Sequence, residues 1–209
     1  MVLQLLTGWG VAVAAQGAAA SSTHDKVHHI IVFGDSLVAG YGLAAQEAFP
    51  EVLGRELAAR GHRVRVTNAG VSGDTTAGGL ARMEWTLADA PDLLILELGA
   101  NDGLRGLDVA TMRSNLAAML DACRRKGVKV LLAGMRAPRN MGPEYVRAFD
   151  VVYPDLARAY GVPLYPFFLD GVALVGALNL PDGLHPNAEG VRVIVGRMLP
   201  HVEKMLPPM

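Results

Sequence analysis

Ser36 is the first residue whose type and position could support chemistry. It follows the apolar run Ile30–Phe33 after only two residues, Gly34 and Asp35. Such a run is typical of a buried strand in a parallel sheet, and open α/β sheets bind their ligands at the carboxyl ends of strands. A rigid scaffold would hold a serine there at the edge of a crevice, which suits a nucleophile. Taken alone, this Gly-Asp-Ser sequence is equally typical of an ordinary turn.

Asp182 and His185 could supply the base that a serine nucleophile requires. A serine hydroxyl reacts poorly until a base takes its proton, and an imidazole base needs an acceptor for its other nitrogen. The two residues are three positions apart, so one turn can hold the carboxylate and the imidazole in contact. The alternative is a plain turn followed by a helix that starts at Pro186.

Three groups could stabilise negative charge on a substrate oxygen during acyl transfer. They are the backbone N–H of Ser36, the backbone N–H of Gly73 and the side-chain amide of Asn101. A glycine lets the backbone approach a ligand closely, and an asparagine offers a neutral donor that does not titrate. Each of the three follows a predicted strand, so we expect them at one edge of the sheet. Asn101 and the two residues after it also fit an ordinary turn.

Apolar runs and breakers predict five strands that alternate with helices, which is typical of a three-layer α/β/α sandwich around a parallel sheet. The most apolar strand, Leu93–Gly99, is expected at the centre of the sheet, and the strand that contains Pro163 at an edge. No linker divides the chain, so residues 27–209 are expected to form a single domain. The expected strands are about 29–33, 64–66, 93–99, 128–133 and 162–164, and the expected helices about 50–60, 76–87, 109–126, 143–160, 171–178 and 186–205. The expected loops after the second and third strands are 68–76 and 100–103.

The composition limits the class of partner. The chain has 209 residues, of which 51% are hydrophobic and 6% aromatic, and its formal net charge is -1. This charge argues against electrostatic binding to nucleic acid or to anionic lipid, and the few aromatic residues argue against stacking on bases. Cys123 is the only cysteine, so neither an intramolecular disulfide nor a cysteine-based zinc site can form. We expect a small or amphipathic partner, and the oligomeric state is left open.

Residues 1–22 differ from the rest of the chain. They are rich in leucine, valine and alanine, and small residues before about Ala20 suit cleavage by signal peptidase. The segment is short and interrupted by glycine, so the mature protein is expected to have no stable membrane span. It also lacks the Lys or Arg that usually begins a signal, which leaves an uncleaved anchor or a disordered segment as alternatives. A cleaved signal predicts a periplasmic or secreted protein.

Four sequence blocks together resemble the SGNH (GDSL-type) hydrolases, a family whose blocks centre on Ser, Gly, Asn and His. Within that family the chain is most similar to the bacterial periplasmic thioesterase I, lysophospholipase L1 and arylesterase group, through residues 97–106 and 165–168. The resemblance covers about Ile30 to Leu199. The blocks are Gly34-Asp35-Ser36-Leu37, Asn68–Asp74, Gly99-Ala100-Asn101-Asp102 and Asp182-Gly183-Leu184-His185-Pro186.

The resemblance implies a flavodoxin-like sheet and hydrolysis of carboxylic esters and thioesters through an acyl-enzyme. It implies Ser36 as the nucleophile, His185 as the base and Asp182 as the partner of that base. Ser36, Gly73 and Asn101 would form the oxyanion hole, and no metal or organic cofactor is implied. Residues 102–106 match a segment that moves on substrate binding in the family.

The acyl chain is expected to bind apolar loop residues near the site, although most of these could equally belong to the core. Two other functions remain open. A carbohydrate O-deacetylase on the same fold would need a polar pocket for sugar, and a catalytically silent binding module would not need the complete set of site residues. The candidate substrate-binding residues are Leu37, Leu104, Leu107, Met135, Met141 and Leu184.

Overall fold

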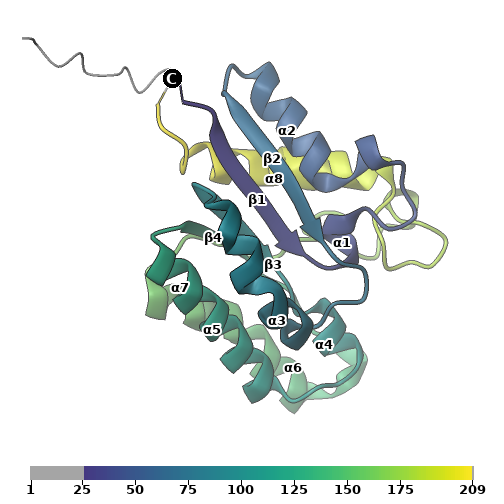
Figure 1. The fold of residues 1–209 in the computed structure, drawn as a ribbon. Helices are drawn as coiled ribbons and strands as arrows, with labels where there is room; N and C mark the ends of the chain where they lie inside the picture. Colours follow the sequence, from purple (N-terminus) through teal and green to yellow (C-terminus); the bar gives the residue numbers. More distant parts are fainter. Residues whose placement is uncertain (1–25, 209) are drawn as a thin grey trace, which may run out of the picture.

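The computed structural model describes residues 26–208, so the predictions for residues 1–22 lie outside the described residues. Five parallel strands form one sheet in the order β2-β1-β3-β4-β5 (Figure 1). This order is that of flavodoxin-like folds, and the predicted α/β fold with a five-stranded parallel sheet is confirmed. The strands are β1 (His28–Gly34), β2 (Val64–Gly70), β3 (Leu93–Glu97), β4 (Lys129–Ala133) and β5 (Leu164–Tyr165).

Helices cover both faces of the sheet and complete the predicted three layers (Figure 1). Helices α2 (Phe49–Ala59) and α8 (Ala188–Glu203) pack together on one face, and α3 (Thr76–Thr86) packs beside α5 (Val109–Lys126) on the other. None of the helices in the described part of the chain is long and apolar enough to span a bilayer. The remaining helices are α1 (Ser36–Ala39), α4 (Ala100–Leu104), α6 (Pro143–Asp150) and α7 (Val152–Tyr160).

Strands β1 and β3 form the centre of the core. Every side chain of Ile30–Phe33 and of Leu93–Leu96 is at most 1% exposed, because both faces of the sheet are covered. Burial of each of these side chains contributes roughly 1.5–3 kcal/mol to the free energy of unfolding. The prediction that the Leu93 strand is central is confirmed, and β5, with Pro163 just before it, is an edge strand as predicted.

Local signals fix most helix ends. The Asp108 carboxylate accepts a hydrogen bond from the Thr111 N–H at 2.7 Å and begins α5, and Gly127 ends that helix with φ 69°. The expected helix 143–160, in which Pro154 predicts a kink, is two helices, with Val151 between them. Pro154 lies three residues later, and its ring cannot coexist with an undistorted turn before it.

Four predicted segments differ from the structure. Asn68–Gly70 was expected in a loop but extends β2, since it pairs in register with Val32–Gly34 of β1. Residues 100–103 form most of α4 rather than a loop. In the expected helix 171–178, residues 171–174 form turns, and only Gly176–Leu178 form a short 3-10 helix. The last helix begins at Ala188, because the Asn187 side chain accepts the Gly190 N–H and so caps it.

Gly70 shows why the small residues of β2 matter for the site. A Cβ atom at Gly70 would lie 2.2 Å from the Ala39 backbone nitrogen. The missing side chain therefore lets α1, which begins at Ser36, approach the end of β2.

Candidate active site

The carboxyl edge of the sheet brings Ser36, His185 and Asp182 into one line of hydrogen bonds. The Ser36 Oγ lies 2.9 Å from the His185 Nε2, and the His185 Nδ1 lies 2.7 Å from the Asp182 Oδ2. Ser36 begins α1 directly after β1, and the other two residues belong to the loop before α8. The imidazole therefore has the serine on one nitrogen and a carboxylate on the other.

The loop that holds His185 is fixed by the Asp182 carboxylate. Asp182 Oδ1 accepts hydrogen bonds from the backbone N–H groups of Leu184 at 2.9 Å and His185 at 3.0 Å. These backbone donors, together with the His185 side chain, lower the pKa of Asp182 to about 2. Because Asp182 stays ionised down to strongly acidic pH, it can orient the imidazole over the whole neutral range.

The backbone N–H groups of Ser36 and Gly73, which both follow the ends of strands, have no acceptor within the described part of the chain. Gly73 has φ 84°, a conformation that favours glycine. The Arg105 Nη2 donates to the Gly73 carbonyl oxygen at 2.9 Å and fixes this peptide. Both N–H groups are thus available to an oxygen atom from outside the protein.

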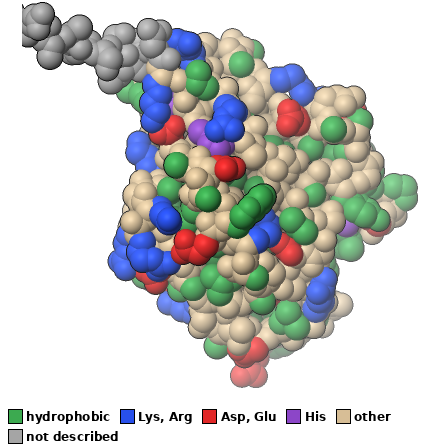
Figure 2. All heavy atoms as spheres, viewed as in Figure 1, with side chains coloured by type: hydrophobic (Ala, Val, Ile, Leu, Met, Phe, Trp, Pro, Cys, Tyr) green, Lys and Arg blue, Asp and Glu red, His purple; other side chains and the backbone are tan. Residues whose placement is uncertain are grey.

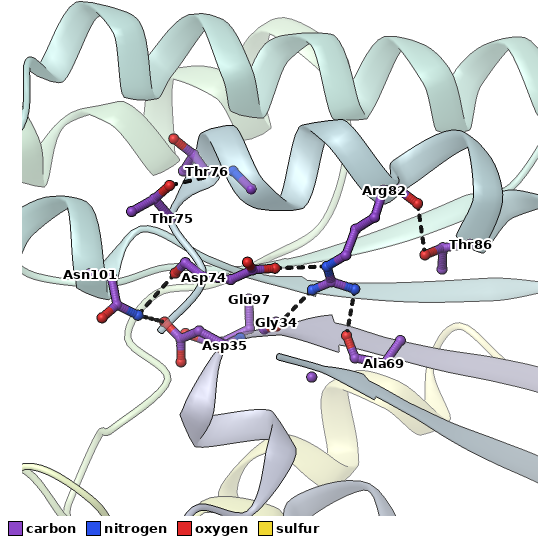
Figure 3. A network of polar contacts seen from close by, with 12 residues as sticks. Gly34, Asp35, Ala69, Asp74, Thr75, Thr76, Arg82, Thr86, Glu97 and Asn101 are labelled. Atoms are coloured by element: carbon purple, nitrogen blue, oxygen red, sulfur yellow. Dashed lines mark hydrogen bonds and ion pairs between the residues drawn. The ribbon is translucent and has the colours of Figure 1, made fainter. Parts of the chain in front are cut away.

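The Asn101 amide differs from these two backbone groups. Its Nδ2 donates to the Asp35 Oδ2 at 3.1 Å and to the backbone oxygen of Asp74 at 2.9 Å (Figure 3). Gly99, the residue that precedes α4, has φ 117°, and a Cβ atom there would lie 2.2 Å from the Tyr153 hydroxyl oxygen. Asn101 therefore has a fixed orientation, but both of its N–H groups already have protein acceptors.

Arg82 is a member of this site that the sequence analysis missed. From α3 it donates to the Asp74 Oδ2 at 2.7 Å and to the backbone oxygens of Ala69 at 2.8 Å and Gly34 at 2.9 Å (Figure 3). Its guanidinium also lies over the Phe33 ring, 3.8 Å from the centroid. Arg82 thereby ties the ends of β1 and β2 to the loop that carries Gly73. The sequence did contain one signal for this role, because Arg82 is a charged residue on the face of α3 whose other residues are buried.

Glu97 was also missed, although a carboxylate at the end of the most apolar strand was a visible signal. It is 0% exposed; its Oε2 accepts a long hydrogen bond of 3.4 Å from the Asp35 N–H, and its Oε1 has no partner. Burial, reinforced by the nearby Asp35 carboxylate, raises the pKa of Glu97 well above its usual range. Burial also raises the pKa of Asp35 to about 6, although hydrogen bonds from Leu37 and Asn101 act in the opposite direction.

The six candidate substrate-binding residues fall into three groups by their burial. Leu37 and Met135 are buried in the hydrophobic core, and Met141 is half-buried. The other three are exposed: Leu104 and Leu107 beyond Asn101, and Leu184 next to His185. We therefore keep Leu104, Leu107, Met141 and Leu184 as candidates for contact with a substrate. Within residues 26–208, no cluster of His, Cys, Asp or Glu could hold a metal ion.

Comparisons with known proteins agree on one family. Residues 32–193 match the model of the GDSL-like Lipase/Acylhydrolase family. The chain is 46% identical to Esterase TesA of Pseudomonas aeruginosa over 158 residues, which is 75% of this chain and 79% of the relative. It is 35% identical to Thioesterase 1/protease 1/lysophospholipase L1 of Escherichia coli strain K12, over 85% of this chain and 84% of the relative. A crystal structure of TesA superposes with a TM-score of 0.82 at 41% identity, covering 86% of this chain and 100% of that one.

The buried Glu97 carboxyl predicts a pH-dependent effect of Glu97→Gln on stability. Because burial raises its pKa, the folded protein keeps a proton that the unfolded chain releases above its usual value of about 4.3. The wild type therefore loses this contribution to its free energy of unfolding as the pH rises from about 4.3 toward the raised pKa of Glu97. Glu97→Gln carries no titrating group, so its free energy of unfolding relative to wild type should be higher at pH 8 than at pH 5, as measured by urea unfolding.

Glu51→Gln is the matched control, because it removes one carboxylate from an exposed position on α2. Its effect on the free energy of unfolding should be the same at the two pH values. The raised pKa of Glu97 is contradicted if the free energy of unfolding of Glu97→Gln, taken relative to wild type, is the same at pH 5 and at pH 8.

Proposed function

Because the chain belongs to the GDSL-like Lipase/Acylhydrolase family, we propose that it is a serine hydrolase that cleaves carboxylic esters and thioesters through an acyl-enzyme. The observation that supports this most directly is the continuous line from the Ser36 Oγ through both nitrogens of His185 to the Asp182 carboxylate. This arrangement of nucleophile, base and orienting acceptor is what a serine hydrolase requires. Membership of the family makes the chain a hydrolase, and the roles of the individual residues are the proposal.

In the proposed reaction, Ser36 attacks the carbonyl carbon of the ester or thioester while the His185 Nε2 takes the hydroxyl proton. The carbonyl oxygen becomes an oxyanion, and Asp182 stabilises the imidazolium through Nδ1. When the tetrahedral intermediate collapses, the imidazolium returns the proton to the leaving alcohol or thiol, and the acyl group stays on Ser36. Water then attacks the acyl-enzyme with His185 again as the base, which releases the carboxylic acid and restores the serine.

The oxyanion is proposed to bind the N–H groups of Ser36 and Gly73, which have no other acceptor among the described residues. Asn101 is proposed as the third donor. Because its N–H groups donate to Asp35 and Asp74, the oxyanion has to share one of these hydrogens. Donors that are fixed before the reaction stabilise the transition state without a cost of reorganisation.

Exposed apolar side chains support an acyl chain rather than a sugar as the group bound next to Ser36. Leu104, Leu107 and Leu184 are 40% to 51% exposed. Figure 2 shows hydrophobic side chains gathered at the edge of the molecule beyond α1, where the loop before α8 lies in Figure 1. The names of the relatives, an esterase and a thioesterase, agree with ester and thioester substrates. Hydrolysis of acetylated sugars in preference to nitrophenyl esters and acyl-CoA would instead favour the O-deacetylase.

Ser36→Ala tests the nucleophile. The variant should keep the fold and lose activity by about 10³-fold or more, because no acyl-enzyme can form. Hydrolysis of a nitrophenyl ester measures the loss, and a fluorophosphonate probe should label the wild type but not the variant.

Ser72→Ala is the matched control, because it removes a hydroxyl from an exposed loop residue next to Gly73. It should keep both activity and labelling. Full activity in Ser36→Ala, or labelling of that variant at the wild-type rate, would contradict the proposed mechanism.

Asn101→Ala tests the third donor of the oxyanion hole. A donor that acts on the transition state should change kcat more than KM, so we expect kcat to fall by about 10²-fold, a loss on the order of 3 kcal/mol. Asn101→Asp should not restore activity, because a carboxylate repels the oxyanion. Steady-state kinetics and thermal unfolding of both variants provide the measurement.

Thermal unfolding is included because Asn101→Ala also removes a hydrogen bond to the buried Asp35 carboxylate. A lower melting temperature with unchanged kcat would make Asn101 structural. A higher KM with unchanged kcat would make it a residue that binds the substrate.

Export of the protein to the periplasm or beyond is the remaining part of the proposal. It is supported by the signal-like composition of residues 1–22. If the signal is cleaved, the mature protein should begin near Ser21. N-terminal sequencing of protein recovered from the periplasm tests this, and an intact Met1 would contradict it.

A further inference from the structure

The ring of Tyr41 lies against the ring of His185. Their centroids are 4.5 Å apart and their planes are inclined by 34°, which makes a tilted stack. Tyr41 is 53% exposed, so burial in the core does not account for its place. Its hydroxyl makes no hydrogen bond to any described residue. The face of the ring is therefore the part of Tyr41 that acts on His185.

The backbone of Tyr41 is bound to the nucleophile itself. The N–H groups of Gly40 and Tyr41 both donate to the Ser36 carbonyl oxygen, at 3.2 and 3.1 Å. Gly40 has φ 82°, and a Cβ atom there would lie 2.6 Å from the Ala48 Cβ. The turn has little freedom to move as a result. Tyr41 thus links Ser36, through its backbone, to His185, through its ring.

We propose that Tyr41 is a positioning residue that holds the His185 imidazole against Ser36 and stabilises the imidazolium that forms when Ser36 loses its proton. This inference rests on the proposed function. The face of an aromatic ring carries partial negative charge and attracts a cation. His185 is neutral before the attack and positive during it. The attraction is therefore stronger in the transition state than in the ground state, and such an interaction increases kcat.

The charged groups near His185 come from two elements of the described chain. Asp182 lies on the same loop and contacts Nδ1, and Asp35 lies at the end of β1 within electrostatic range. Both favour the imidazolium, and neither is changed by a substitution at Tyr41. A change of the ring alone therefore reports the contribution of its face.

Three variants at this position separate the ring from the hydroxyl. Tyr41→Leu removes the aromatic face but keeps an apolar side chain. We expect its kcat to fall by about 3- to 10-fold with little change in KM, and the acid limb of the pH profile of kcat/KM to move down by about half a pH unit. Tyr41→Phe keeps the face and should match the wild type. Tyr41→Trp offers a stronger cation–π face and should move the acid limb to higher pH.

Trp85→Leu is the matched control, because it removes an aromatic ring that is 81% exposed near the C-terminal end of α3. It should change neither kcat nor the acid limb. Thermal unfolding checks that each variant is folded.

A second measurement does not depend on catalysis. NMR follows the titration of the His185 ring, whose signal is assigned by its loss in His185→Asn. The midpoint should move to lower pH in Tyr41→Leu and to higher pH in Tyr41→Trp. If the enzyme lacks the proposed activity, this titration still tests the contact between the rings.

Three results would overturn the inference. The first is a midpoint and an acid limb that are the same in the wild type, Tyr41→Leu and Tyr41→Trp. The second is an equal loss in Tyr41→Phe and Tyr41→Leu, which would assign the effect to the hydroxyl. The third is a rise in KM alone, which would make Tyr41 a residue that contacts only the substrate.

Discussion

The hydrogen bond between Ser36 and His185 joins residues that are 149 positions apart in the chain, and the rest of the structure makes this contact possible. Closing so long a segment has an entropic cost that one hydrogen bond cannot offset. The buried strand β1 fixes the serine end, and hydrogen bonds around the loop before α8 fix the histidine end. The Leu180 N–H donates to the His185 carbonyl oxygen at 2.7 Å, and the Asn187 N–H donates to that of Leu178 at 2.9 Å. The packing of α8 against α2 holds that loop over the same edge of the sheet that carries Ser36.

The burial that makes the site rigid also limits the negative charge that acidic residues can place near Ser36. Asp35 and Glu97 are both 0% exposed, and two negative charges so close together would oppose an oxyanion forming at the neighbouring Ser36. Burial raises the pKa of Glu97 well above its usual range, so this carboxyl keeps its proton, and stays uncharged, to a higher pH than an exposed glutamate does. Arg82 pairs with the Asp74 carboxylate. In the proposed mechanism the site therefore meets the developing negative charge with less opposing charge than its acidic residues would suggest.

The sequence was sufficient for the class of fold and for the central strands, because runs such as Leu93–Leu96 have few alternatives to burial in a parallel sheet. It was less reliable in segments of small residues, whose composition does not distinguish a strand from a loop. Asn68–Gly70 reads as a loop by composition, and only pairing with β1 makes it a strand. The sequence also suggested which side chains should meet at the sheet edge, since their types and order are specific. The charged side chain of Arg82 on the inward face of α3 and the carboxylate of Glu97 at the end of β3 were visible in the sequence, but their roles depend on contacts between separate elements that have no local pattern.

The two acceptors of the Asn101 amide differ in how readily they could share a hydrogen with a substrate. The backbone oxygen of Asp74, at 2.9 Å, belongs to a peptide whose side chain is paired with Arg82, so this acceptor is fixed. The Asp35 Oδ2 is farther away at 3.1 Å, and that carboxylate also accepts the Leu37 N–H at 3.0 Å. Loss of part of the Asn101 bond leaves Asp35 with another donor, whereas the Asp74 oxygen would have to leave a fixed position. The proposed oxyanion is therefore expected to compete with Asp35, and Asp35 then serves to hold the Asn101 amide in place until the substrate carbonyl becomes charged.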